Sequence, residues 1–94
     1  MSGRILVAED DARMREILED YFSDAGYTVL TACDGAEALR VFEREQVDVV
    51  LLDVMMPQLD GWSVCRRIRQ RSDVLIVMLS ARSEEDDRLM GFEL

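Results

Sequence analysis

The chain has 94 residues, 49% of them hydrophobic, which is enough for one small domain with a packed core. Its formal net charge of −9 opposes binding to nucleic acid and to anionic membrane surfaces. The apolar run over 74–79 is too short to span a membrane, and the N-terminal apolar stretch is too short for a signal peptide. We therefore expect a cytoplasmic protein that does not attach to membranes.

The first half of the chain alternates between strand and helix patterns. The branched apolar residues at 5–8 predict a strand buried on both faces. Apolar residues three and four positions apart then predict a helix, which Gly26 ends as a C-terminal cap. Residues 27–32 predict a second strand, and Asp34 opens a second helix. The apolar positions of the two helices are Met14, Ile17, Leu18, Tyr21, Phe22 and Ala25 in the first, and Ala38, Leu39 and Phe42 in the second.

The third strand and helix follow the same alternation. Residues 47–52 predict a strand that leads into Asp53, and Pro57 with Asp60-Gly61 marks a loop. A third helix comes next, and its inner positions are Val64, Cys65 and Ile68.

The last predicted elements are a strand and a helix. Residues 74–79 predict a fourth buried strand that leads into Ser80, and the pattern over 84–94 predicts a helix. Four strands that alternate with helices imply a parallel sheet with helices on both faces. In such sheets, ligands bind beyond the carboxyl ends of the strands.

Polar side chains follow three of the predicted strands. Glu9 and Asp10 come after the first strand, Asp53 after the third and Ser80 after the fourth. Parallel strands bring these positions to one edge of the sheet, where two carboxylates about 4 Å apart repel by about 4 kcal/mol at an effective dielectric of about 20. The pattern therefore predicts a Mg²⁺ site that a phosphoryl group completes. Asp53 would be the nucleophile that forms an acyl phosphate, and Ser80 could donate a hydrogen bond to a phosphoryl oxygen.

Three stretches of the sequence resemble the receiver domain of bacterial two-component response regulators. They are RILVAEDD at 4–11, VVLLDVMMP at 49–57 followed by Asp60-Gly61, and VMLSAR at 77–82. The order and the spacing of the predicted elements agree with that family over the whole chain. The resemblance implies an α/β fold, a flavodoxin-like doubly wound parallel sheet with strand order 2-1-3-4.

The resemblance also implies roles for the acidic residues at the strand ends. Asp53 is the phosphoacceptor, and Glu9 and Asp10 are the acidic pair that holds Mg²⁺. Asp53 itself and the backbone carbonyl of Met55 are the further metal ligands that the family pattern implies.

Three neighbouring positions complete the site that the resemblance implies. Ser80 occupies the hydroxyl position that senses phosphorylation, and Ala81 is the small residue that leaves room beside the phosphate. Asp11 is the third acid in its row, and we interpret it as the cap of the first helix because the family's metal pair is the first two.

The partners implied by the resemblance are those of a signalling module, not of an enzyme with a substrate of its own. A sensor histidine kinase donates the phosphoryl group, and the conformational change that follows controls an output. The motif context favours regulators of transcription, whose winged-helix DNA-binding domain would lie outside this chain. The chain itself is expected not to bind nucleic acid.

The sequence departs from the receiver pattern after the fourth strand. The family has a lysine after a fifth strand and then a fifth helix, whereas this chain contains no lysine and ends at Leu94, within the predicted fourth helix. We therefore interpret residues 1–94 as an incomplete receiver domain. The strand at 74–79 would become a long apolar sheet edge, which predicts self-association through that edge. The alternative function is a truncated fragment that no longer signals and only self-associates.

Three other classes of protein share parts of this pattern. Phosphatases with an aspartyl nucleophile carry a second Asp two residues later, where this chain has Met55. A flavin-binding domain would need a Ser-, Thr- or Gly-rich loop after the first strand, where the acidic row would repel phosphate. A zinc site is disfavoured because Cys33 and Cys65 form no CxxC motif and the chain has no histidine, so we expect both thiols to be buried and reduced.

Overall fold

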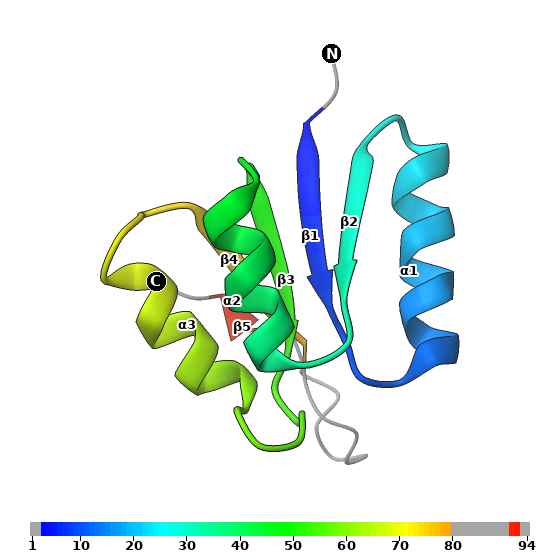
Figure 1. Cartoon of the computed structure of the whole chain (residues 1–94). Coiled ribbons are helices and arrows are strands. Elements are labelled where there is room, and N and C mark those ends of the chain that lie inside the picture. Colours follow the sequence, from blue (N-terminus) through cyan, green and yellow to red (C-terminus); the bar gives the residue numbers. More distant parts are fainter. Residues whose placement is uncertain (1–2, 80–90, 93–94) are drawn as a thin grey trace.

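From Arg4 to Leu79, strands and helices alternate along the chain as the hydrophobic pattern predicts (Figure 1). The computed structural model describes residues 3–79 and 91–92. Its elements are β1 (Arg4–Ala8), α1 (Ala12–Asp24), β2 (Thr28–Ala32), α2 (Gly35–Arg44), β3 (Val49–Asp53), α3 (Gly61–Arg69), β4 (Leu75–Leu79) and β5 (Gly91–Phe92). None of the helices within these ranges is both long and apolar enough to cross a membrane.

The strands form one sheet in the order β2-β1-β3-β4-β5. The first four strands of that order are parallel, so the predicted order 2-1-3-4 is confirmed, and the described residues contain no fifth parallel strand. The helix α1 lies on one face of the sheet, and α2 and α3 lie on the other (Figure 1). The predicted doubly wound α/β arrangement is therefore present.

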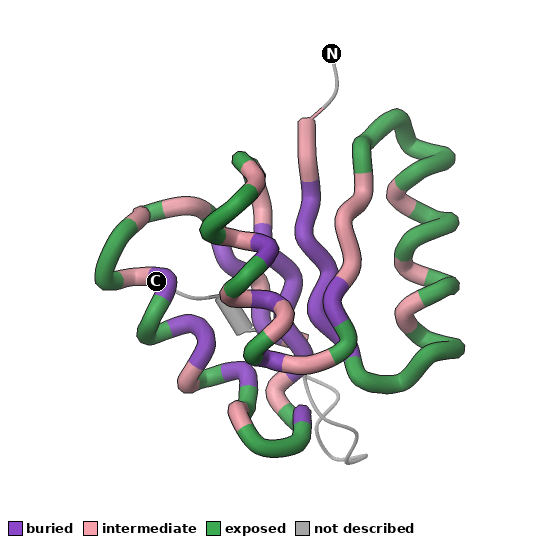
Figure 2. The backbone as a smooth tube through the Cα atoms, viewed as in Figure 1, coloured by how far each residue is buried: buried purple, intermediate pink, exposed green. Residues whose placement is uncertain are grey.

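The sheet separates two apolar layers because successive side chains of a strand point to opposite faces. On one face, the fully buried side chains of Leu6, Leu52 and Ile76 belong to the core that α2 and α3 cover. On the other face, Ile5 and Val7 pack toward α1. Figure 2 shows the buried residues concentrated in the central strands. This packing holds the ends of β1 and β3 in fixed positions.

The helix α1 buries only part of its apolar stripe. Leu18 and Phe22 pack against the sheet, whereas Met14, Ile17 and Tyr21 are 42%, 54% and 66% exposed. No residue of α1 is fully buried (Figure 2). Of the helices in the described residues, α1 alone lies on this face, so the rest of its stripe has no neighbouring helix to pack against (Figure 1).

The edge of the sheet beside β4 differs from the prediction. Gly91–Phe92 forms the short strand β5, which pairs antiparallel with Val77 and Met78, whereas the sequence pattern predicts a helix over 84–94. An exposed strand carries unpaired backbone N–H and C=O groups, and pairing with β5 satisfies some of them. The prediction of a bare edge at β4 was therefore wrong for these two positions. The rest of the predicted helix lies outside the described residues, and self-association through β4 stays a prediction.

The two cysteines have different surroundings. Cys65 is buried in the core beneath α3, as predicted. Cys33 is exposed, so the prediction of a buried thiol was wrong at this position. The reason is local, because Cys33 follows Ala32, the last residue of β2, and already lies in the loop that leads into α2.

Asp11 caps the amino terminus of α1, as predicted. Its carboxylate accepts hydrogen bonds from the backbone N–H groups of Arg13 (2.9 Å) and Met14 (3.2 Å). Asp11→Ala should therefore lower the free energy of unfolding by about 1 kcal/mol, measured by urea denaturation. The control is Asp20→Ala, on the exposed side of the same helix, which should change this free energy by about 0.5 kcal/mol or less. Equal losses in the two variants would contradict a capping role.

Candidate functional site

The acidic residues predicted at the strand ends lie together. Glu9 and Asp10 directly follow β1, and Asp53 is the last residue of β3, which is the neighbour of β1 in the sheet. Each of the three side chains offers a carboxylate oxygen, and these oxygens all lie within 4.8 Å of one another. We call Glu9, Asp10 and Asp53 the carboxylate cluster.

Two members of the carboxylate cluster are buried. Glu9 is 6% exposed and Asp53 is 7% exposed, whereas Asp10 is exposed to solvent. The pKa of Glu9 is raised to about 7, first because burial disfavours its charged form and then because Asp53 and Asp10 add negative charge nearby. The backbone N–H of Asp11 donates to Glu9 Oε2 (3.1 Å) and partly opposes this rise. Burial and mutual repulsion thus both act against full ionisation of the carboxylate cluster.

The backbone of Glu9 is held from two sides. Its N–H donates to the carbonyl oxygen of Ala32 at 3.1 Å, which continues the β1–β2 pairing by one residue. Its own carbonyl oxygen accepts a hydrogen bond from Nη1 of Arg15 at 2.7 Å. The sequence alone does not single out Arg15, because only its position one helical turn into α1 sets it apart. It supports Glu9 through the backbone and leaves the carboxylate facing the cluster.

Asp53 is oriented by the loop that follows it. The backbone N–H of Met55 donates to Asp53 Oδ1 at 3.2 Å. The loop returns to the strand at Gly61, whose N–H donates to the carbonyl oxygen of Val54 at 3.1 Å. A side chain at Gly61 would overlap the backbone carbonyl of Asp53. In the sequence, Gly61 marks a loop and belongs to the receiver-like motif, and the structure shows that this loop needs a residue without a Cβ.

The carboxylate cluster has the donors that a hard divalent cation prefers. It offers carboxylate oxygens only, and a cation among them would favour the charged form of Glu9, whose pKa is raised by burial and then by repulsion from Asp53 and Asp10. Mg²⁺ is commonly held by a few carboxylates together with waters and a phosphate. The residues therefore fit Mg²⁺. The structure places Met55 beside Asp53 through its N–H, and the use of its carbonyl as a ligand stays a prediction.

Two predicted site residues, Ser80 and Ala81, lie outside the described residues. Leu79, which precedes them in the chain, pairs with Asp53 across β3 and β4. The fourth strand therefore ends beside the third, as the sequence pattern predicts. The roles of Ser80 and Ala81 stay predictions.

Comparison with known sequences gives a consistent result. The model of the response regulator receiver domain matches residues 5–94. The probable transcriptional regulator ycf27 of Porphyridium aerugineum is 52% identical over 91 residues, which cover 97% of this chain and 38% of that protein. The alkaline phosphatase synthesis transcriptional regulatory protein PhoP of Bacillus subtilis (strain 168) is 43% identical over 95 residues, which cover 100% of this chain and 40% of that protein. The chain spans about two fifths of the length of these relatives.

Solved structures of similar proteins share the fold. The response regulator TrrA from Thermotoga maritima, in complex with Mg²⁺-BeF, matches with a TM-score of 0.82 and 38% identity over 89% of this chain and 74% of that chain. The chemotaxis response regulator CheY4 of Vibrio cholerae matches with a TM-score of 0.83 and 32% identity over 94% of this chain and 77% of that chain. These matches agree with the parallel strand order of the sheet.

Proposed function

The chain belongs to the response regulator receiver domain family, and from this membership we propose that it accepts a phosphoryl group on Asp53 with Mg²⁺ held in the carboxylate cluster. The observation that carries the proposal is the cluster itself. Two of its three carboxylates are buried beside each other, which is costly when both are ionised and less costly with a cation among them. The chain is thus a phosphoacceptor, and no reaction on a separate substrate is proposed.

The proposed metal ligands are Glu9, Asp10, Asp53 and the backbone carbonyl of Met55. When bound, Mg²⁺ supplies positive charge opposite the oxygens of the phosphoryl group. The protein contributes the fixed arrangement of the ligands, because Glu9 directly follows β1 and Asp53 ends β3, and these two strands are paired in the core. Support also comes from TrrA, a response regulator whose structure contains Mg²⁺-BeF.

The proposed chemistry is a single displacement at phosphorus. A carboxylate oxygen of Asp53 forms a bond to phosphorus, and the bond between phosphorus and the donor breaks, with its electron pair leaving on the donor. The N–H of Met55 holds Asp53 Oδ1 and so fixes the orientation of the carboxylate. Ser80 would donate a hydrogen bond to the transferred group, and Ala81 would leave room for it.

The proposed partners follow from the family. A sensor histidine kinase would be the phosphoryl donor, and the phosphorylated chain would control transcription through a DNA-binding output domain outside these residues. The relatives ycf27 and PhoP are transcriptional regulators by name. Direct nucleic-acid binding by this chain is not proposed, because its net charge is −9. The proposed setting is the cytoplasm.

The test is phosphoryl uptake from a small donor. Incubation with Mg²⁺ and acetyl phosphate should add one phosphoryl group to the intact chain by mass spectrometry, and beryllofluoride with Mg²⁺ should bind as a stable mimic. Asp53→Asn should abolish both signals because it removes the nucleophilic oxygen. Chelation of Mg²⁺ should abolish them as well.

The matched control is Asp24→Asn, at the exposed end of α1 and outside the carboxylate cluster. This variant should take up the phosphoryl group at the wild-type level. A wild-type signal no larger than that of Asp53→Asn would refute the proposal. It would favour the alternative, a fragment that does not signal and only self-associates.

A further inference from the structure

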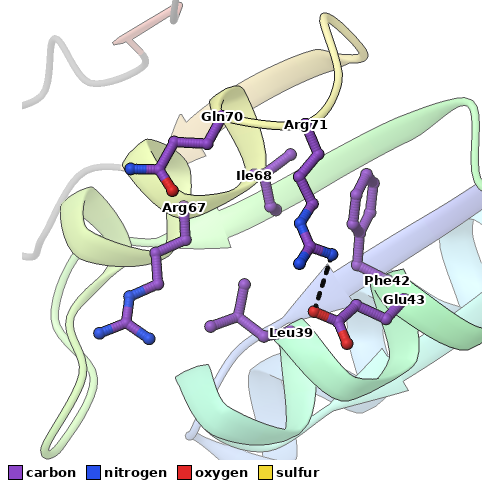
Figure 3. Close-up of a pocket in the computed structure, with 7 residues that line it drawn as sticks. All are labelled: Leu39, Phe42, Glu43, Arg67, Ile68, Gln70 and Arg71. Carbon is purple, nitrogen blue, oxygen red and sulfur yellow. Dashed lines mark hydrogen bonds and ion pairs between the residues drawn. The ribbon is translucent and has the colours of Figure 1, made fainter.

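A groove separate from the carboxylate cluster lies between α2 and α3 (Figure 3). It has a volume of about 330 Å³ and is lined by the last turns of α2, the last turn of α3 and the two residues after it. Both helices begin near the carboxyl-terminal ends of the strands, where the carboxylate cluster lies, and run back toward the amino-terminal ends (Figure 1). We call this feature the α2–α3 groove, and it has no residue in common with the proposed phosphoacceptor site.

The floor of the α2–α3 groove is apolar. Leu39 and Phe42 of α2 are partly buried, and Ile68 of α3 is buried in the core beneath them. Figure 3 shows these side chains projecting into the space between the two helices. A floor of this size can accept one large apolar side chain, whose burial there would add to the affinity.

The rim of the α2–α3 groove is positively charged. Arg67 and Arg71 come from α3 and the turn after it (Figure 3). Nη1 of Arg71 pairs with Oε2 of Glu43 at 3.0 Å, but the two side chains are 59% and 52% exposed. Such an exposed ion pair contributes little, so Arg71 can pair with a carboxylate of a partner instead. In the part of the chain that the structure describes, Arg67 has no ion pair. The rim thus offers two accessible guanidinium groups above an apolar floor.

The two rim arginines belong to a local cluster of positive charge on an otherwise acidic chain. The net charge is −9, yet four of the eleven basic residues fall at 66, 67, 69 and 71. Cations near the end of α3 favour the helix dipole, but arginines this close together also repel one another. A partner that brings carboxylates would relieve this repulsion and would be attracted to this side of an otherwise acidic molecule.

We propose that the α2–α3 groove binds an acidic peptide segment of a partner protein. One large apolar side chain of the segment would lie on the floor formed by Leu39, Phe42 and Ile68, and flanking carboxylates would pair with Arg67 and Arg71. This binding does not require phosphorylation of Asp53.

The neighbouring surface favours a short acidic peptide over a nucleic acid. An adjoining hollow shares Phe42 and Glu43 with the α2–α3 groove and is also lined by Glu45 and Asp48. A long polyanion that crossed the groove would meet Glu45 and Asp48, whereas a short segment would meet only Glu43, which lines the groove itself. The open rim equally disfavours a small molecule, which gains affinity mainly from enclosure.

The probe is a panel of short fluorescein-labelled peptides with a central Leu, Phe, Met or Trp between Glu and Asp residues. Fluorescence anisotropy should show saturable binding of at least one member. Replacing its flanking acids by Gln and Asn, or its central residue by Ala, should weaken binding about tenfold or more.

Variants of the rim locate the binding. Arg67→Gln and Arg71→Gln should each weaken binding about tenfold, and Glu43→Gln should bind at least as tightly as wild type because it removes a competing carboxylate. The control is Arg66→Gln, because Arg66 donates to Ser63 Oγ at 3.3 Å and does not line the groove, so binding should stay within about twofold. Circular dichroism checks that all variants fold, which their exposed positions predict.

Two results would overturn the proposal. One is that no peptide of the panel binds in a way that depends on Arg67 or Arg71. The other is that a short duplex DNA binds these arginines more tightly than every acidic peptide. Binding of beryllofluoride with Mg²⁺ should be the same in Arg67→Gln and wild type, so failure at the groove and failure at Asp53 remain distinguishable.

Discussion

Gly61→Ala should lower the free energy of unfolding by about 3 kcal/mol, although it adds a single methyl group. Gly61 begins α3, and its Cα lies against the backbone of Asp53. An added Cβ would overlap the carbonyl oxygen of Asp53 and would also lie 3.0 Å from its carbonyl carbon and from Cε of Met78. The Met78 side chain can move, but the backbone of a core strand cannot move without disturbing its pairing. The clash must therefore displace either α3 or the end of β3.

The same change should reduce the proposed function, because β3 ends in Asp53. Where Gly61→Ala still folds, beryllofluoride binding should weaken by about tenfold or more. The control is Gly26→Ala. Gly26 has φ of +100° but nothing within 4 Å of an added Cβ, so the cost is conformational and about 1 kcal/mol, and binding should be unchanged. Chemical denaturation measures both variants, and a loss at Gly61 no larger than that at Gly26 would show that the close approach is unimportant.

The strand ends could be predicted from the sequence because their signals are local. β1, β3 and β4 lie in short apolar runs that stop abruptly at a polar residue, as at Glu9 and Asp53. The parallel order then follows from the alternation with helices, and it brings those residues to one edge. The carboxylate cluster is thus a consequence of pattern and topology, and its geometry agrees with the prediction.

Other features depend on contacts between distant residues and have no local signal. The apolar stripe of α1 predicts a buried face, yet Ile17 and Tyr21 are more than half exposed. Among the described residues, no other helix lies beside α1 on its face of the sheet. The contact of Arg15 with the Glu9 carbonyl depends on how α1 is set against β1. The short pairing of β5 with β4 is equally non-local, and the helical spacing over 84–94 pointed to a different structure.

Asp53→Asn should make the metal-free chain more stable while removing its response to Mg²⁺. At about pH 8, above the raised pKa of about 7, Glu9 is ionised beside Asp53 and Asp10. Each unit of a pKa shift corresponds to about 1.36 kcal/mol, and the charge of Asp53 accounts for only part of the shift at Glu9. Replacing Asp53 by the neutral amide should therefore raise the free energy of unfolding in EDTA by about 1 kcal/mol.

Mg²⁺ should reverse this order. At about 100 times its dissociation constant, a cation that binds only the folded chain stabilises it by about 2.7 kcal/mol, which exceeds the gain from Asp53→Asn. Thermal or urea denaturation with and without Mg²⁺ should thus show wild type below the variant in EDTA and above it in Mg²⁺. The control Asp24→Asn should respond to Mg²⁺ as wild type does. If Mg²⁺ stabilised wild type and Asp53→Asn equally, the cation would bind elsewhere. The burial of Glu9 and Asp53 would then need a reason other than metal-assisted phosphoryl uptake. The reversal of the stability order between EDTA and Mg²⁺ therefore tests whether these buried carboxylates serve the proposed function.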